Sequence, residues 1–256
     1  MKLTGQVALV TGAPGGIGSA ICRALASQGA SLILHYRSRE AECRALQEEL
    51  ESNKVTDEQA FVSIRADLLS DEQTRAMVSE AITHFSRLDI LVNNAGWSRH
   101  VPPNQLNDLD EQLFELTVGL KIQAPIYLAR ACREQLAASG NGQIINITSV
   151  AGIAARGSSI VYAAANAALS SLTQSLARTL APEIRVNAIA PGFVETGFVW
   201  PKDGKVKAYV AQQNHIGRTV EAEEVAEVVR FLACDAPAIT GEEIAIDGGI
   251  GRLGKK

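Results

Sequence analysis

The residues Thr11-Gly12-Ala13-Pro14-Gly15-Gly16-Ile17-Gly18 decide the fold, because they join a short apolar run over 7–11 to a helical pattern over 17–28. A strand, a glycine-rich turn and a helix in this order form the unit that binds dinucleotides. Glycine permits a tight turn and close approach of the backbone, while free N–H groups at the start of the helix attract an anionic pyrophosphate. The alternative is an ordinary tight turn. The order of the elements favours a dinucleotide site.

Apolar runs of strand length alternate with longer helical patterns along the rest of the chain. They predict strands over 7–11, 31–36, 60–66, 89–93, 143–148, 185–190 and 243–246, and helices over 17–28, 39–52, 71–85, 110–138, 161–180 and 222–234. Continuously apolar strands between helices indicate a parallel sheet covered on both faces, and right-handed crossovers make it doubly wound. We therefore expect one α/β domain over 1–256. Segment 194–217 breaks the pattern and predicts a loop that acts as a substrate lid.

The composition argues against several classes of protein. The 256 residues carry 24 Lys and Arg against 28 Asp and Glu, a formal net charge of −4, whereas nucleic-acid partners require a basic face. No stretch approaches about 18 consecutive apolar residues, so we expect no membrane-spanning helix. The first residues lack a secretory signal, and the four cysteines lie far apart without a CxxC pair. Together these features predict a cytoplasmic protein without a metal site.

The end of the second predicted strand indicates which dinucleotide binds. An acidic side chain there would accept hydrogen bonds from the ribose 2′-OH of NAD. The sequence instead reads Leu34-His35-Tyr36-Arg37-Ser38-Arg39, with no carboxylate before Glu40. Arg37, Ser38 and Arg39 can bind a 2′-phosphate, since guanidinium groups match phosphate geometry. We expect NADP(H) to be preferred over NAD(H), the alternative being a solvated basic start to a helix.

Further motifs follow the later predicted strands. They are Asn93-Asn94-Ala95-Gly96, Ser149 thirteen residues before Tyr162, Pro191-Gly192 with Thr196, Thr240-Gly241, and Asp247-Gly248-Gly249. Together with the glycine-rich turn, they resemble the short-chain dehydrogenase/reductase family over essentially the whole chain. The resemblance implies a mostly parallel, seven-stranded Rossmann-type sheet flanked by helices, in a homotetramer or homodimer. It also implies hydride transfer between a nicotinamide cofactor and a small-molecule ketone or secondary alcohol.

The same resemblance implies roles for individual residues. Ser149 would orient and polarise the carbonyl, and Tyr162 would donate or accept the proton, because developing charge on oxygen needs donors already aimed at it. Asp67 resembles the residue that contacts the adenine, although it could simply cap the next helix. The residues expected to bind the cofactor are Gly12, Gly16, Ile17, Gly18, Arg37, Ser38, Arg39, Asp67, Asn93, Ala95, Gly96, Tyr162, Asn166, Pro191, Gly192, Val194 and Thr196.

Two positions depart from the family pattern. The family places a lysine four residues after the tyrosine, where a cation lowers a phenol pKa that is ordinarily near 10. Here Tyr162-Ala163-Ala164-Ala165-Asn166 puts Asn166 at that position. The family also carries an asparagine in the helix after NNAG, and the neighbouring Phe114 and Ala124-Pro125 place Lys121 there. Lysine and asparagine are thus exchanged relative to the family.

Three interpretations of this exchange remain open. The substitutions are unrelated and efficient catalysis is lost, or the ungapped placement is wrong and Lys121 faces solvent. The third is relocation, in which Lys121 reaches Tyr162 from the neighbouring helix while Asn166 holds the ribose. A long flexible side chain makes relocation feasible, and a nearby cation would lower the pKa of Tyr162.

Alternative functions also remain open beside an NADP(H)-preferring oxidoreductase. One is a 3-oxoacyl carrier-protein reductase, the family member that the general plan of the chain most resembles. Lys202, Lys205 and Lys207 in segment 194–217 could attract an acidic carrier protein or form a solvated loop. Another is a non-catalytic NADP(H)-binding sensor or scaffold. Trp97 and Trp200 could wall an apolar substrate pocket, or belong to the core and to an interface.

Overall fold

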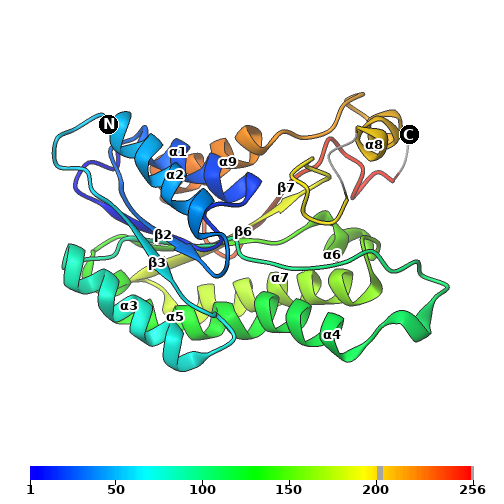
Figure 1. Ribbon diagram of the computed structural model, residues 1–256, viewed down its shortest axis with the longest axis horizontal. Coiled ribbons are helices and arrows are strands. Elements are labelled where there is room, and N and C mark those ends of the chain that lie inside the picture. The colour runs from blue at the N-terminus through cyan, green and yellow to red at the C-terminus, as the bar shows by residue number, and fades with distance from the viewer. Residues whose placement is uncertain (201–203, 255–256) are drawn as a thin grey trace.

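Parallel strands form the centre of the molecule, and helices cover both faces (Figure 1). The computed structural model describes residues 1–200 and 204–254. Within those residues the sheet has seven strands, all parallel, in the order β3-β2-β1-β4-β5-β6-β7. They are β1 (Val7–Val10), β2 (Ser31–Tyr36), β3 (Phe61–Arg65), β4 (Ile90–Asn93), β5 (Gly142–Ile147), β6 (Ile184–Pro191) and β7 (Glu243–Ile246). The order confirms the expected doubly wound, Rossmann-type sheet.

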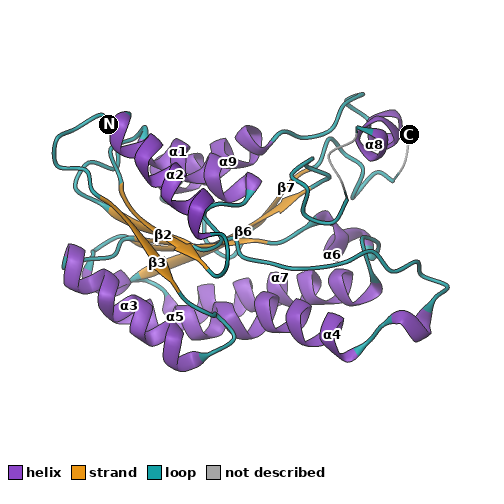
Figure 2. Cartoon of the chain, in the orientation of Figure 1, coloured by secondary structure: helices purple, strands orange, loops and turns teal. Residues whose placement is uncertain are grey.

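The sheet is buried on both faces, as its continuously apolar strands predict. Side chains of β1 alternate between two cores, with Ala8 and Val10 in one and Val7 and Leu9 in the other. Figure 2 shows the two helical layers that cover these cores. One contains α1 (Gly16–Ala26), α2 (Glu40–Ser52) and α9 (Ala222–Cys234); the other contains α3 (Asp71–Phe85), α4 (Glu111–Val118), α5 (Ala124–Ala138) and α7 (Ile160–Leu180).

The register of the sheet aligns the strand ends that carry the motifs. Val10 of β1 lies opposite Leu34 of β2 and Val92 of β4. Because all strands run in one direction, the segments that follow them emerge at one edge. Residues distant in sequence therefore meet there, as in other open α/β sheets.

The single helix predicted over 110–138 is interrupted by a π-helical turn, η2 (Gly119–Gln123), between α4 and α5. In a regular α-helix, the N–H of residue 125 would donate to the carbonyl of Lys121. Pro125 has no N–H, and its ring would clash with that carbonyl. The wider turn avoids the clash, and Ala124 N bonds instead to the carbonyl of Gly119, five residues back. Lys121 lies on this turn.

Three further helical segments lie outside the predicted helices. The 3₁₀ turn η1 (Leu106–Asp108) precedes α4, and α6 (Val150–Ala154) begins after Ser149, whose hydroxyl accepts a hydrogen bond from the N–H of residue 151 at 3.2 Å. The helix α8 (Lys205–Gln213) lies inside segment 194–217, where a loop was expected. The spacing of Val206, Tyr209 and Val210 places these side chains on one helical face. That periodicity was the available signal for α8.

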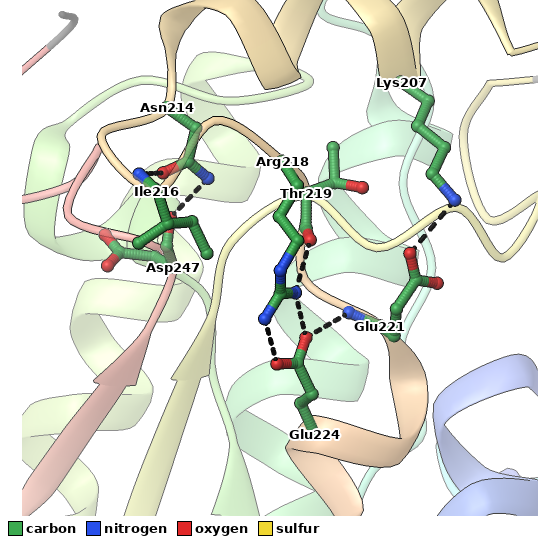
Figure 3. A network of polar contacts seen from close by, with 8 residues as sticks. All are labelled: Lys207, Asn214, Ile216, Arg218, Thr219, Glu221, Glu224 and Asp247. Atoms are coloured by element: carbon green, nitrogen blue, oxygen red, sulfur yellow. Dashed lines mark hydrogen bonds and ion pairs between the residues drawn. The ribbon is translucent and has the colours of Figure 1, made fainter.

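Polar contacts fix the segment that joins α8 to α9 (Figure 3). Asn214 Nδ2 donates to the main-chain carbonyl of Asp247 at 2.9 Å. Arg218 forms an ion pair with Glu224 at 2.7 Å, and Glu224 also accepts from the N–H of Glu221 at 2.9 Å, within the capping box of α9. Segment 194–217 is thereby anchored at its C-terminal end to the chain that follows β7.

The described residues contain four free thiols and no disulfide. None of the helices in the described part of the chain is long and apolar enough to cross a membrane. Residues 1–200 and 204–254 contain no group of His, Cys, Asp and Glu side chains arranged to hold a metal ion.

Candidate active site

A cavity of about 870 Å³ opens at the carboxyl ends of the parallel strands. Its wall combines the glycine-rich turn, the end of β2, the residues after β4 and β5, and the chain that follows β6. The predicted site residues that line it are Gly12, Gly16, Ile17, Gly18, Arg37, Ser38, Arg39, Ala95, Gly96, Lys121, Ser149, Tyr162, Pro191, Gly192, Val194 and Thr196. Trp97 and Trp200 line it as well. The fold thus brings most of the predicted residues together.

The glycine-rich turn is packed so closely that larger residues would not fit. A Cβ atom on Gly18 would lie 2.3 Å from the Gly12 carbonyl oxygen, and one on Gly16 would lie 2.5 Å from the Thr196 methyl carbon. Gly12 also has a φ of +63°, which side-chain-bearing residues rarely adopt. The turn therefore requires glycine for its own shape and for its contact with the chain after β6.

Two polar side chains hold this turn, and neither was among the predicted site residues. Asn94 Nδ2 donates to the Thr11 carbonyl at 2.8 Å. His35 Nδ1 accepts from Gly12 N at 3.1 Å, and its Nε2 lies 3.1 Å from the Ala66 carbonyl. Burial lowers the pKa of His35 to about 4, so near neutral pH the ring is uncharged and carries its proton on Nε2. Asn94 belongs to the NNAG motif, whereas no sequence signal distinguishes His35.

The start of α1 offers a site for an anion. Its N-cap, Gly15, provides no side-chain hydrogen bond, and no acidic residue lies in its first turn. By contrast, the starts of α3, α4, α6, α7 and α9 are capped by Ser70, Asp110, Ser149, Ser159 and Glu221. The first-turn residues Gly16, Ile17 and Gly18 line the cavity without a side-chain cap. The start of α2 also lacks a side-chain cap, but Glu40 and Glu42 lie in its first turn. The start of α1 is therefore the one of these two that suits the pyrophosphate of a dinucleotide.

The two arginines after β2 differ in their surroundings. Arg39 forms an ion pair with Glu42 at 3.0 Å, one turn along α2. Arg37 is exposed on the cavity wall and forms no ion pair within residues 1–200 and 204–254. Arg37 is therefore the better placed of the two to meet an added phosphate.

Tyr162 and Ser149 lie together on the cavity wall. Ser159 accepts a hydrogen bond from Tyr162 N at 3.0 Å and thereby fixes the first turn of α7. Burial raises the pKa of the Tyr162 hydroxyl, and hydrogen bonds with the side chains of Ser149 and Asn166 lower it in part. The Phe198 ring lies 6.2 Å from the Tyr162 ring and covers it from the chain after β6. A protonated phenol beside a serine hydroxyl is suited to hold and protonate a carbonyl oxygen.

Lys121 points into the molecule rather than to solvent. The residue is 4% exposed, and its Nζ donates to the Ile147 carbonyl at 2.8 Å. A Cβ atom on Gly96 would lie 3.3 Å from Nζ, so the ammonium also lies against the NNAG segment. Burial lowers the pKa of Lys121 to about 8. Lys121 also lines the cavity, and no hydrogen bond joins it to Tyr162 in the described part of the chain.

Three predicted residues lie outside the cavity lining. Asn166 is fully buried; its Nδ2 donates to the Tyr162 carbonyl at 2.8 Å, and its Oδ1 has no partner in the described structure. Asn93 is the last residue of β4 and is buried, and its Nδ2 donates to Asn146 Oδ1 on the neighbouring strand at 2.8 Å. Asp67 accepts from the N–H of residue 69 at 3.0 Å, and Ser70 is the residue that caps α3.

The remaining sequence candidates lie around segment 194–217. Trp200 packs against Phe193 and His100, with ring centroids 6.1 Å and 5.6 Å away. Lys207 forms an ion pair with Glu221 at 3.0 Å, while Lys202 lies outside the described residues. The half of the cavity away from the glycine-rich turn, which segment 194–217 borders, is lined mainly by aromatic and aliphatic side chains.

Comparison with known proteins covers nearly the whole chain. Residues 12–251 match the family model described as Enoyl-(Acyl carrier protein) reductase. The chain is 35% identical over 245 residues to a "Granaticin polyketide synthase putative ketoacyl reductase 2" of Streptomyces violaceoruber, covering 95% of both proteins. It is 34% identical over 248 residues to a cis-4-hydroxycyclohexanecarboxylate dehydrogenase of Sinomonas cyclohexanicum, covering 95% of this chain and 96% of that protein.

The same likeness holds in three dimensions. A crystal structure of a short chain dehydrogenase from Burkholderia cenocepacia J2315, in complex with NADP, superposes with a TM-score of 0.88 at 32% identity. The match covers 97% of this chain and 98% of that one.

Proposed function

Because the chain belongs to the short-chain dehydrogenase/reductase family, oxidoreductases that act on alcohol and carbonyl groups with a nicotinamide cofactor, we propose that it is an NADP(H)-preferring enzyme interconverting a ketone and a secondary alcohol. The observation that carries the proposal is one cavity that joins Ser149 and Tyr162 to the uncapped start of α1 and to Arg37. Family membership also makes a non-catalytic sensor the weaker alternative.

The residues of this chain fit a bound NADP(H). The first turn of α1 would hold the pyrophosphate, and Arg37 would bind the 2′-phosphate. The role of Asn166 in holding the ribose comes from the family pattern. Because Asn166 is fully buried behind the cavity lining, this role requires the wall beside Tyr162 to admit a ribose hydroxyl to its unpartnered Oδ1. When bound, the nicotinamide supplies or takes up the hydride at the reacting carbon.

The protein side of the reaction is proton transfer and orientation. Ser149 donates a hydrogen bond to the carbonyl oxygen, and Tyr162 gives that oxygen a proton during reduction and removes it during oxidation. The raised pKa of Tyr162 keeps its proton in place near neutral pH. We propose that Lys121 supplies the positive field that the family takes from its lysine, acting from the Gly96 side of the cavity rather than through contact with Tyr162.

Segment 194–217 would close over this site. Phe198 and Trp200 already line the cavity from this segment, and its far end is anchored through Asn214 to Asp247. Such a cover would exclude water from the reacting atoms.

Oxidation of NADPH and of NADH, followed at 340 nm with ketones, β-ketoesters and acyl thioesters, tests the proposal. We expect kcat/KM with NADPH to exceed that with NADH at least about tenfold, and Arg37→Gln to reduce this preference while the exposed Arg44→Gln control retains it. Tyr162→Phe should lower kcat at least about hundredfold. Preference for NADH, or full activity of Tyr162→Phe, would contradict the proposal.

A 3-oxoacyl carrier-protein reductase is the second candidate, and the likeness to a ketoacyl reductase supports it. The same assay separates the two, because a carrier-protein reductase should act better on acyl thioesters than on free ketones. Equal or better activity on free ketones would favour the first proposal.

A further inference from the structure

The half of the cavity away from the glycine-rich turn is lined mainly by apolar side chains, with few charged groups among the described residues. Five charged side chains of described residues line the whole cavity: Arg37, Arg39, Lys121, Arg156 and Glu195. The first two lie at the end of β2, beside the glycine-rich turn, and Lys121 is buried with its Nζ on the Ile147 carbonyl. The other half is lined by groups such as Trp97, Phe193, Phe198, Trp200, Val206 and Val210. Arg156 and Glu195 are thus the charges available to a substrate.

Glu195 already has partners. Its carboxylate accepts a hydrogen bond from Gly204 N at 3.1 Å. It also lies near Lys207, whose pKa is raised mainly by the hydrogen bond with Glu221 and to a lesser degree by the charge of Glu195. Arg156 forms no ion pair with Glu195 or with any other carboxylate in the described residues. Among the described residues that line this part of the cavity, Arg156 therefore offers a positive charge without a carboxylate partner.

The backbone beside Arg156 packs near the catalytic pair. A Cβ atom added to its neighbour Gly157 would lie 2.8 Å from Ala151 Cβ, too close to fit, and 3.4 Å from Tyr162 Cδ1, in ordinary van der Waals contact. Its Nη2 donates to the Ile250 carbonyl at 2.8 Å. The next residue, Gly251, packs against Val150, since an added Cβ would lie 3.1 Å from Val150 Cβ. The Arg156 guanidinium thus lies beside Ile250 and Gly251, which pack near Val150, the residue after Ser149.

The chain that orients the guanidinium is itself held in place. Asp247 accepts hydrogen bonds from Gly249 N at 2.8 Å and from Gly251 N at 2.6 Å, on either side of Ile250. The Ile250 carbonyl takes one of the five N–H groups of Arg156 and leaves the others for a ligand. A guanidinium held by one carbonyl can still present a pair of parallel N–H groups to a carboxylate.

We propose that Arg156 binds a carboxylate of the substrate, so that the substrates are keto acids and the corresponding hydroxy acids, with the carboxylate separated from the reacting carbonyl by an apolar body. The proposal rests on the proposed function, because it assigns the far end of the same reacting molecule. One guanidinium matches the single charge of a carboxylate, whereas a phosphate carries about two charges at neutral pH. The aromatic and aliphatic walls match the body between the two ends.

The test uses keto acids and their neutral methyl esters: 4-oxopentanoate, 5-oxohexanoate and 4-oxocyclohexanecarboxylate. For the best-fitting acid we expect kcat/KM about tenfold to hundredfold above that of its ester, with the difference mainly in KM. Arg156→Gln should remove this preference and leave the ester within about twofold, and Arg156→Lys should keep part of it. Arg178→Gln, an exposed α7 residue outside the cavity lining, has the same net charge change and should behave as wild type.

Binding separates this proposal from the proposed function. Both tryptophans line the cavity, so quenching of their fluorescence reports binding without turnover. We expect the acid to bind the NADP⁺-saturated enzyme, with which a ketone cannot react, about tenfold or more tighter than its ester, and Arg156→Gln to abolish that difference. Turnover of esters with no preference for acids, in rate or in binding, would overturn the carboxylate site while leaving the proposed function intact. Tighter acid binding that depends on Arg156, without turnover of any compound, would support the site and contradict the proposed function.

Discussion

The charge of Lys121 is held where few lysines are found. The ammonium is buried against Gly96 and the Ile147 carbonyl, and the loss of hydration lowers its pKa to about 8. It is therefore mostly protonated at neutral pH and becomes neutral in mildly alkaline solution. Tyr162 behaves in the opposite way, because its raised pKa keeps it protonated over the same range. Any loss of activity near pH 8 should then report Lys121.

We expect kcat for ketone reduction to fall as the pH rises through about 8, because the positive field of Lys121 disappears there. Lys121→Met should lower kcat at neutral pH about hundredfold and remove this alkaline limb. The measurement is kcat between about pH 6 and pH 10 for both proteins. Lys54→Met, which removes a lysine paired with Glu51 at the surface, is the control. An unchanged rate and an unchanged pH profile in Lys121→Met would reject the relocated charge.

At the scale of elements, the π-helical turn η2 sets the direction of Lys121. It adds one residue to a helical turn, and one residue rotates the following side chains by about 100° in a helix. Gly119 also lies too close to Leu69 for a side chain, since an added Cβ would be 2.5 Å from Leu69 Cδ2. Pro125 and this packing together hold the wide turn in place. Such turns often occur at functional sites.

Pro125→Ala should destabilise the π-helical turn η2. The new N–H can bond to the carbonyl of Lys121, so the chain can relax towards a regular α-helix and move the ammonium away from Gly96. We expect kcat to fall about tenfold, while the melting temperature followed by circular dichroism changes by no more than a few degrees. Pro102→Ala, in the loop before η1, serves as the matched control and should change neither quantity. Wild-type turnover in Pro125→Ala would show that the π-turn does not position Lys121.

At the scale of the whole molecule, the layer that contains α4, α5 and α7 carries exposed apolar side chains. Phe114 of α4 is 57% exposed and Ile126 of α5 is 41% exposed. These helices and α7 form the layer that resembles the associating surface of the family, and burying such side chains would stabilise an assembly. We propose that copies of this chain associate through this face.

Light scattering after gel filtration tests the assembly. We expect a homotetramer of about 109 kDa, four times the 27.2 kDa of one chain. Phe114→Glu with Ile126→Glu should yield smaller species, because two charges would be buried at the contact. Glu substituted for exposed Phe231 of α9, on the opposite layer, is the control. A monomeric wild-type protein would refute the proposal.

The sequence by itself determined the architecture and most of the cavity wall. The positions of the strands and the doubly wound arrangement follow from apolar runs, glycine positions and right-handed crossovers, which are local or general properties of chains. The carboxyl ends of parallel strands lie at one edge of the sheet, so motifs at those ends must lie close together. Of the helices that sequence analysis did not predict, α6 is short and begins at a single serine cap, whereas α8 carries its signal in the spacing of Val206, Tyr209 and Val210.

Only the tertiary structure decided the environment of each polar group. Whether Lys121 faces solvent, whether Asn166 keeps an unpartnered oxygen and whether Arg156 meets a carboxylate all depend on residues far away in the chain. The same applies to His35, which burial keeps neutral and which thereby holds the glycine-rich turn. Burial and hydrogen bonding set pKa values and orientations, and both arise from packing between elements. A sequence specifies which groups are present, but their charge states and partners are properties of the folded molecule.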